Sequence, residues 1–288
     1  CEVSAPLALG KYGGNNDDDS SGLLRYVIIE DAGYVVSPAQ AFNALSLNAL
    51  GKATTVEALH IVNSAATALA INGGDVDLSQ VILSQSAGTG LRWNDGWSGS
   101  IQQLLVDGGS SGKHAIEGGN SKNMAIAEVA LPRSSPLLAN VSIIHRAAPA
   151  AVSLFNHTAA SMFGLVIDNP DGICFARDNV GLDRVEMSFS MVSCNSFAMD
   201  AASIDWFEQA ELTLSSSELT LNGYLNTQLV ADFPIIGMPV LPDLARLAYI
   251  GAVGFCEDDW TQGWALDLPA VDSALCPVPT LAVPLDST

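Results

Sequence analysis

Basic residues are scarce in this sequence. Only 11 Lys and Arg accompany 31 Asp and Glu, so the formal net charge is −20 and the isoelectric point lies near 4.2. Nucleic-acid binding depends on Lys and Arg contacts to phosphate, so this chain is not expected to bind nucleic acid. Docking on anionic lipid headgroups is disfavoured for the same reason. Strongly acidic surfaces repel one another, which suits an exposed or saline setting.

Long hydrophobic runs are also missing. Apolar residues make up 49% of the chain, yet no stretch of 18 or more occurs, so we expect no membrane-spanning helix. The chain begins at Cys1, with neither an initiator Met nor a signal-peptide pattern. We therefore expect a processed form or part of something longer.

Cysteine is infrequent and lacks metal-site spacing. There are 5 Cys and no Cys-x-x-Cys or Cys/His cluster, so no metal centre is predicted. Cys174 and Cys194 are 20 residues apart, and so are Cys256 and Cys276. This pattern predicts two disulfides and an oxidising compartment, with Cys1 left over. Buried free thiols are the alternative.

What the sequence does contain is a repeat. Three units follow one another, and each has a short apolar segment that leads through a turn to a second one. The units join residues 56–62 to 68–74, 76–83 to 88–93, and 101–106 to 112–119. The first segments recur at a steady distance, since Leu59 to Val81 is 22 residues and Val81 to Leu104 is 23. A β-strand repeat of this length is typical of a solenoid.

The second segments agree with the same period. Leu69 to Leu91 is 22 residues and Leu91 to Ala115 is 24. The pattern resumes beyond a longer excursion at 120–136, where Leu165 to Phe189 is again 24. We predict an all-β right-handed parallel β-helix with coils of about 22–24 residues, in which each coil buries its apolar side against the next.

The predicted organisation has three parts. Residues 1–22 are irregular, 23–202 form the parallel β-helix, and 203–288 hold final strands, a non-repeating C-terminal cap and a tail. A cap is expected because an open β-helix end exposes unpaired strand edges. Alternate strand residues share a face, and the following should point inward in ladders: Leu59, Ile61, Val81, Leu83, Leu104, Val106, Val141, Ile143, Leu165 and Ile167.

Four segments carry a family resemblance: 23–27, 93–99, 248–253 and 258–264, the last reading Asp-Asp-Trp-Thr-Gln-Gly-Trp. The chain resembles secreted or surface-anchored β-helical lipoproteins of Gram-negative bacteria, often encoded near TonB-dependent receptors and without an assigned activity. The resemblance implies that this chain is the C-terminal portion of such a protein and that Cys1 is an internal cysteine, although a lipid-bearing Cys1 stays open. Related chains often carry acidic pairs where this one has Ala65-Ala66 and Gly88-Thr89.

One candidate binding site is an aromatic corner. Trp93 and Trp97 flank Asp95 at a predicted turn, and two aromatic faces beside a carboxylate suit sugar stacking. The alternative is that both Trp side chains only cover the flank of the helix. Trp260 and Trp264 are expected to pack in the cap against the last coil.

A second candidate is a charged patch. Arg92 and Lys113 fall at nearly equivalent places in adjacent coils, with Asp95 and Glu117 beyond them. An enzyme acting on acidic sugars would need such a patch to converge on one substrate position. The alternative, which we expect, is a ladder of salt bridges along an exposed flank with no cleft beside it.

Other catalytic or metal signals are few. Asp17, Asp18 and Asp19 are a candidate Ca²⁺ site, but a solvated acidic loop is the alternative because the spaced ligand pattern is missing. The four histidines are His60, His114, His145 and His157. None has a Ser or Cys partner that the sequence places, so no nucleophilic triad is predicted.

The sequence thus favours a non-enzymatic extracellular or outer-membrane-surface scaffold for binding or assembly. The expected partners are a surface glycan, other surface proteins including a TonB-dependent receptor by resemblance, or further copies of the chain. Two alternatives remain: a polysaccharide lyase or hydrolase, and a structural subunit of a surface assembly or filament. No cofactor is expected apart from the Ca²⁺ candidate.

Overall fold

A computed structural model gives the structure of the chain. It describes residues 12–37, 40–109, 113–146, 150–210, 213–215, 221–225, 244, 245, 247, 249–254, 256 and 259–275. In chain order the elements are β1 (Leu23–Glu30), β2 (Tyr34–Ser37), β3 (Gln40–Phe42), β4 (Leu45–Leu50), β5 (Thr55–Val62), β6 (Leu69–Gly74), β7 (Leu78–Ser84), β8 (Leu91–Asn94), β9 (Ser100–Gly109), β10 (Ile116–Gly118), β11 (Leu137–His145), β12 (Val152–Phe155), β13 (Ala160–Ile173), β14 (Phe175–Asp178), η1 (Leu182–Arg184), β15 (Val185–Ser188), β16 (Ser190–Ser196), α1 (Ala201–Gln209), β17 (Thr213–Ser215) and η3 (Ser273–Leu275).

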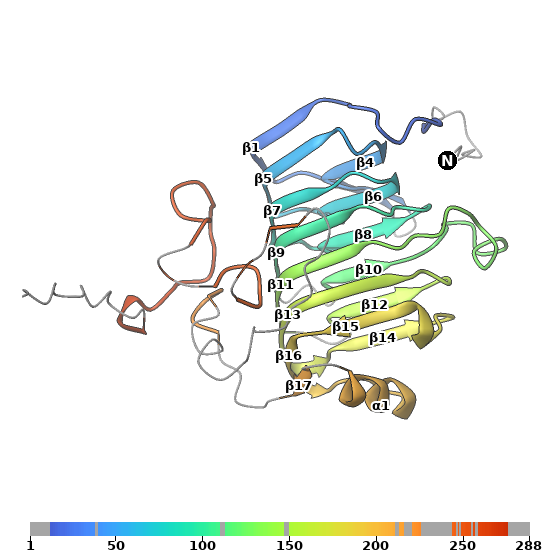
Figure 1. Cartoon of the computed structure of the whole chain (residues 1–288). Coiled ribbons are helices and arrows are strands. Elements are labelled where there is room, and N and C mark those ends of the chain that lie inside the picture. The colour runs from blue at the N-terminus through green and yellow to red at the C-terminus, as the bar shows by residue number, and fades with distance from the viewer. Residues whose placement is uncertain are drawn as a thin grey trace, which may run out of the picture.

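The strands form a parallel β-solenoid, as predicted. A large sheet runs in the order β1-β5-β7-β9-β11-β13-β16-β17, with β15 also paired to β13. A 6-stranded sheet runs in the order β14-β12-β10-β8-β6-β4. From β4 to β14 successive strands alternate between the two sheets, so the coils stack along one axis (Figure 1). An antiparallel β2–β3 pair, which the sequence did not predict, follows β1.

The predicted inward ladders are confirmed. One ladder joins Leu59, Val81, Leu104, Val141 and Leu165 in register across five coils. A second ladder, two residues further along the same strands, joins Ile61, Leu83, Val106, Ile143 and Ile167 in the same order. All ten side chains are wholly buried in one core cluster. Repeated stacking of like apolar residues is what holds neighbouring coils together.

Two predicted registers are wrong by one residue. Leu91 pairs with Ile116 rather than Ala115. The amide of Leu165 donates to Ser190 Oγ at 3.3 Å, so Ser190 rather than Phe189 lies beside it. Phe189 instead has a left-handed backbone with φ 52°, as do Ala58, Gln80 and Gln103 at the matching bend of earlier coils. The bend thus recurs at the same register position of these coils.

Helix α1 closes one end of the solenoid. The sequence predicts final strands in the part that begins at residue 203, and the structure has this helix there, followed by the strand β17. Asp200 caps it by accepting a hydrogen bond from the Ser203 amide at 3.0 Å, as an N-cap aspartate does. Phe207 stacks on Phe197 at a centroid distance of 4.1 Å, so an aromatic layer seals the core there.

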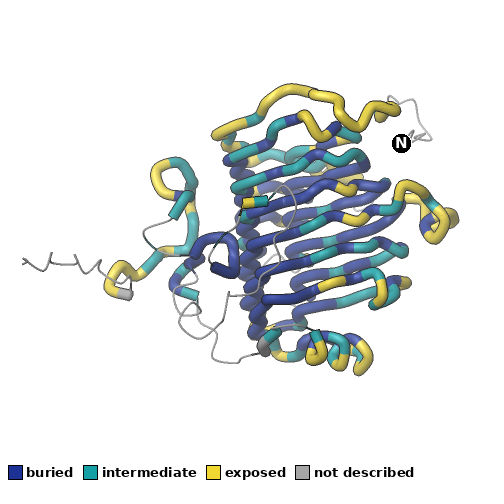
Figure 2. The backbone as a smooth tube through the Cα atoms, viewed as in Figure 1, coloured by how far each residue is buried: buried dark blue, intermediate teal, exposed yellow. Residues whose placement is uncertain are grey.

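The chain beyond α1 first adds β17 beside β16 at that end of the large sheet. Its described residues between 249 and 272, here called the strap, lie against the outer face of the large sheet (Figures 1 and 2). Ile82, Leu105 and Ile144 point outward from β7, β9 and β11 and are buried beneath it. Trp264 packs beside Tyr26 and His60 of the first coils, far along the solenoid from α1. The outer face is apolar, so it needs a cover.

One predicted disulfide is present. Cys174 and Cys194 are bonded with a Cα–Cα separation of 5.7 Å. Cys276 lies outside the described residues, so its pairing with Cys256 remains a prediction. Of the helices in the described ranges, none is long and apolar enough to cross a membrane.

Removal of the Cys174–Cys194 bond should destabilise the last coils. It closes a loop with a sequence separation of 20 residues. Constraint of the unfolded chain by such a loop is worth about 3 kcal/mol. A Cys174→Ala/Cys194→Ala variant should therefore lose about that much free energy of unfolding in urea titrations under oxidising conditions. Peptide mapping of non-reduced protein that finds both thiols free would contradict the prediction.

Candidate functional site

The predicted aromatic platform is wrong, because both tryptophans belong to the core. Trp93 and Trp97 each have 0% exposure and meet edge to face at 6.2 Å. Trp93 points inward from β8 and donates from Nε1 to Thr158 Oγ1 at 3.1 Å. Its ring fills the space over Gly118 of the next coil, where any Cβ would overlap it. Neither ring offers a face to a sugar.

The charged patch does not converge on one substrate position. Arg92 and Glu117 are register partners on β8 and β10 and form an ion pair, with Arg92 Nε 2.8 Å from Glu117 Oε2. This is the salt bridge between coils that we expected along a flank. Lys113 is exposed just before β10. Asp95 follows β8, beyond the corner.

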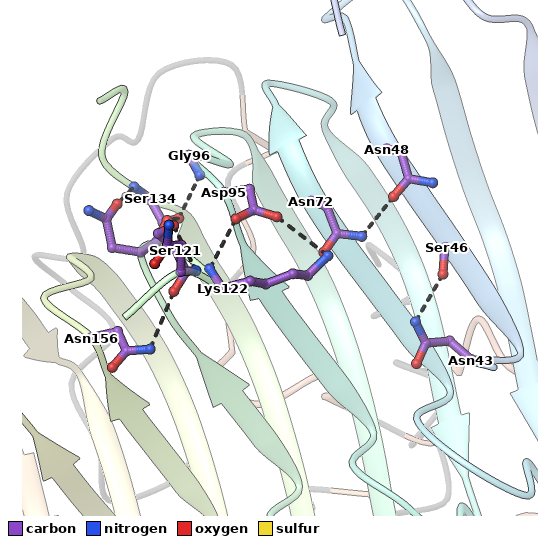
Figure 3. Close-up of polar contacts among 12 residues, drawn as sticks. Asn43, Ser46, Asn48, Asn72, Asp95, Gly96, Ser121, Lys122, Ser134 and Asn156 are labelled. Atoms are coloured by element: carbon purple, nitrogen blue, oxygen red, sulfur yellow. Dashed lines mark hydrogen bonds and ion pairs between the residues drawn. The ribbon is translucent and has the colours of Figure 1, made fainter. Parts of the chain in front are cut away.

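Asp95 is shielded rather than solvated, which corrects our expectation. Its side chain is only 5% exposed and lies 3.4 Å from Lys122 Nζ. The Lys122 amide also donates to Asp95 Oδ1 at 3.1 Å (Figure 3). Tyr12 approaches from the N-terminal loop: its burial, with Asp95 beside it, raises the pKa of the Tyr12 phenol to about 12. Asp95 therefore ties the N-terminal loop and the 120–136 excursion to one corner.

Polar side chains line this corner from coil to coil. Asn48 and Asn72 are register partners at the ends of β4 and β6, and Asn72 Nδ2 donates to Asn48 Oδ1 at 2.7 Å (Figure 3). The Gly96 amide donates to Ser134 Oγ at 2.9 Å, and Asn156 Nδ2 donates to the Ser121 carbonyl at 3.3 Å. These bonds fix the turns whose outer side forms the site.

A pocket of about 300 Å³ opens on the outer side of these turns. It lies between the N-terminal loop, the turns after β4 and β6, the turn at 96–98, and Pro132. The loop is held there by a bond from the Lys52 amide to the Asp17 carbonyl at 2.7 Å. Gly51 permits this close approach, since a Cβ there would lie 2.5 Å from the Asp19 carbonyl oxygen. Sequence alone could not show that the loop folds back.

Asp17 and Asp75 are the carboxylates that line this pocket. Oδ1 of Asp75 is shielded from solvent and has no hydrogen-bond partner among the described residues. Burial raises the pKa of the Asp75 carboxyl, and the neighbouring Asp17 raises it further, while Lys52 opposes both. A donor group that reached the Asp75 carboxyl from the pocket would satisfy this acceptor oxygen.

The Ca²⁺ candidate at Asp17, Asp18 and Asp19 is not supported. Asp17 lines the pocket, whereas Asp19 accepts from Ser21 Oγ at 3.4 Å and the Asp18 amide donates to Asn16 Oδ1 at 3.3 Å. Over the described ranges, no three or more His, Cys, Asp or Glu side chains gather as a metal site.

A histidine–serine pair escaped the sequence analysis. His60 Nε2 lies 2.9 Å from Ser84 Oγ, and His60 Nδ1 accepts from the Leu266 amide at 3.3 Å. Because Nδ1 accepts, the neutral ring carries its proton on Nε2 and donates it to Ser84. A general base needs the opposite tautomer, so Ser84 is not activated as a nucleophile. The register could have revealed the pair. Ile82 is opposite His60, and Ser84 lies two residues further along β7, on the same face of the strand.

Fold and site together define a parallel β-solenoid domain with a covered flank and a small acidic corner pocket. A family model described as a pectate-lyase-like β-helix domain matches residues 2–265. The chain belongs to this family of β-helix domains. Comparisons with curated proteins and with solved structures find no match. The β-helical part of the resemblance is therefore confirmed, whereas the lipoprotein part remains a prediction.

Proposed function

We propose that this domain is a non-enzymatic extracellular scaffold whose corner pocket binds a neutral sugar. The single observation that carries the proposal is the pocket itself, with its unpartnered Asp75 oxygen and its Asp17 carboxylate. Sugar hydroxyls are donors that such oxygens accept. A volume of about 300 Å³ is at the lower end for small-molecule sites, so one or two sugar rings are the matching size.

The charge distribution supports a neutral ligand over a uronate. Five basic side chains are already paired with carboxylates: Arg25–Glu57, Arg92–Glu117, Lys122–Asp95, Arg146–Asp168 and Arg177–Asp200. The residues that line the pocket include two carboxylates and no Lys or Arg. In a chain of net charge −20, an anionic polysaccharide would be repelled.

Calorimetric titration with neutral and uronic oligosaccharides tests this function. Neutral sugars should bind and uronates should bind at least about tenfold more weakly, because a like charge beside Asp75 costs over 1 kcal/mol. Asp75→Ala should weaken neutral-sugar binding about 10-fold or more, as expected when a hydrogen bond to a charged group is lost. Asp18→Ala is the matched control, since Asp18 is an exposed carboxylate outside the pocket.

The same titrations can fail in two informative ways. Tighter binding of uronates than of neutral sugars would contradict the electrostatic argument. Equal losses in Asp75→Ala and Asp18→Ala would show that the sugar binds elsewhere.

Glycoside hydrolysis is a second candidate, favoured by one specific observation. Burial raises the pKa of Asp75, and Asp17 lines the same pocket, so two carboxyls are available for the acid and base roles of such an enzyme. Release of reducing ends from a neutral polysaccharide, abolished in Asp75→Asn while binding persists, would replace the scaffold by this hydrolase.

For location and partners we propose the cell surface or the extracellular space. The Cys174–Cys194 disulfide supports an oxidising, non-cytoplasmic compartment. Helix α1 closes one end of the solenoid, which disfavours end-to-end filaments and leaves the flanks for contacts with other surface proteins. A receptor of the TonB-dependent class is the partner that the family resemblance implies.

A further inference from the structure

The strap covers a face that would otherwise be apolar and exposed. Ile82 and Leu105 point outward from β7 and β9, and both have 0% exposure. They form one cluster with Ala252 and Val253 of the strap, against which Trp260 and Trp264 pack. Sheet faces that contact water are normally polar, so this apolar face is stable in water only while the strap covers it.

The strap is held along its length by specific hydrogen bonds. At its first part, the Gly251 amide donates to the Gly164 carbonyl and the Ala252 amide donates to Ser142 Oγ, both at 2.8 Å. At its later part, residues 260–268, Trp264 packs edge-on against Tyr26 at 6.0 Å and His60 at 6.3 Å. Fewer hydrogen bonds join this later part to the sheet.

His60 makes the key polar contact of the later part. It is wholly buried under the strap, and Nδ1 accepts from the Leu266 amide at 3.3 Å. Nε2 donates to Ser84 Oγ at 2.9 Å. In the neutral form of His60, both ring nitrogens therefore have a hydrogen-bond partner. A second proton would sit on Nδ1 and face the Leu266 N–H, leaving two donors opposed in a buried site.

We infer that residues 260–268 form a proton-sensitive latch, docked on the sheet while His60 is neutral and released when His60 takes up a proton. Release removes Trp260 and Trp264 from the apolar row at Ile82 and Leu105, while the solenoid beneath stays folded because its own core does not include the strap. An acidic environment would thus expose part of this apolar row on an otherwise covered flank.

The direction of the pH effect follows from linkage. Burial lowers the pKa of docked His60 from 6.5 to about 4, and Asp267 on the strap partly opposes this. The docked state is therefore fully favoured above pH 6.5 and loses stability as pH falls toward 4. A difference of 2.5 pH units (6.5 minus 4) shifts the ratio of docked to released strap by roughly 300-fold.

Other titratable groups face the latch and must be separated from His60. On the strap these are Asp267 and Asp259, and Asp259 accepts from the Tyr224 hydroxyl at 2.7 Å. From the sheet, Ser84 on β7 and Ile28 on β1, the register partner of His60, add no charge. Because these carboxyl groups lie on the strap itself, the test needs a variant that removes only the histidine.

Hydrogen exchange of the full-length protein between pH 7 and pH 3.5, corrected for intrinsic rates, tests the latch. Strap amides, with Leu266 among them, should lose protection by up to roughly 300-fold over this range, while amides of β7 and β9 stay protected. In His60→Gln the loss should be much smaller, because Gln can accept from Leu266 and donate to Ser84 but does not titrate.

The control is His157→Asn, which removes a histidine elsewhere at a left-handed position of φ 60° that Asn tolerates. This variant should follow the wild type. If His60→Gln fails to fold, the His60 pKa of the wild type, measured by NMR, decides the matter instead. A pKa near 6.5, unchanged strap protection at pH 3.5, or simultaneous exchange of strap and sheet would each overturn the latch.

Discussion

Leu104→Asp should abolish the folded solenoid. Leu104 is wholly buried at the centre of the ladder that joins Val81 and Val141, and the substitution places a charge without a partner in that core. The combined loss of packing and burial of a charge costs about 5 kcal/mol or more, which is comparable with the whole stability of many domains. Far-ultraviolet circular dichroism and urea titration measure the effect.

Ser46→Asp is the matched control for this charge. Ser46 is exposed on β4 and accepts from Asn43 Nδ2 at 2.9 Å, a bond that an aspartate can also accept (Figure 3). The Ser46→Asp variant should retain the wild-type circular dichroism spectrum and the wild-type midpoint of urea unfolding. A folded Leu104→Asp protein with unchanged circular dichroism would show that the ladder register is wrong.

Trp93→Ala should reduce stability strongly and leave sugar binding intact in the protein that remains folded. Deleting a fully buried tryptophan costs about 3–5 kcal/mol, and here it also leaves Thr158 Oγ1 without its donor. Trp93→Phe keeps most of the volume and should cost roughly 1–2 kcal/mol, chiefly for the lost hydrogen bond. Urea titrations and calorimetry separate the two properties. A stable Trp93→Ala protein that no longer binds sugar would restore the aromatic platform that the structure contradicts.

The ladders were predictable because strand alternation and coil spacing depend on local residues. The spacing of Leu59, Val81 and Leu104 shows the period directly, and the stacking of similar coils leaves little freedom in how the strands pair. The bend was not predictable, since Ala58, Gln80 and Gln103 are not residues that favour a left-handed backbone.

The position of the strap had a signal that the sequence analysis did not use. Val81-Ile82-Leu83 and Leu104-Leu105-Val106 are continuous apolar runs, which are typical of strands buried on both faces. A one-sided coil would have polar residues at Ile82 and Leu105. The runs therefore required a cover on the outer face, and the apolar C-terminal segment supplies it.

The candidate site depended on contacts between distant parts of the chain. Whether Trp93 faces solvent or core is decided by Gly118 in the next coil, which leaves room for the ring. The pocket needs the loop at 14–17 to return over Gly51 and Gly74, and no local pattern shows that return. The sequence analysis placed Arg92 beside Lys113, whereas the register of β8 and β10 pairs Arg92 with Glu117.

The most direct test of the scaffold account is a crystal structure of the protein soaked with a neutral disaccharide that it binds. The account predicts an intact sugar in the corner pocket, with a hydroxyl within hydrogen-bond distance of Asp75 Oδ1 and the strap and core unchanged. Sugar bound only outside the pocket, or a cleaved product held between Asp17 and Asp75, would contradict it.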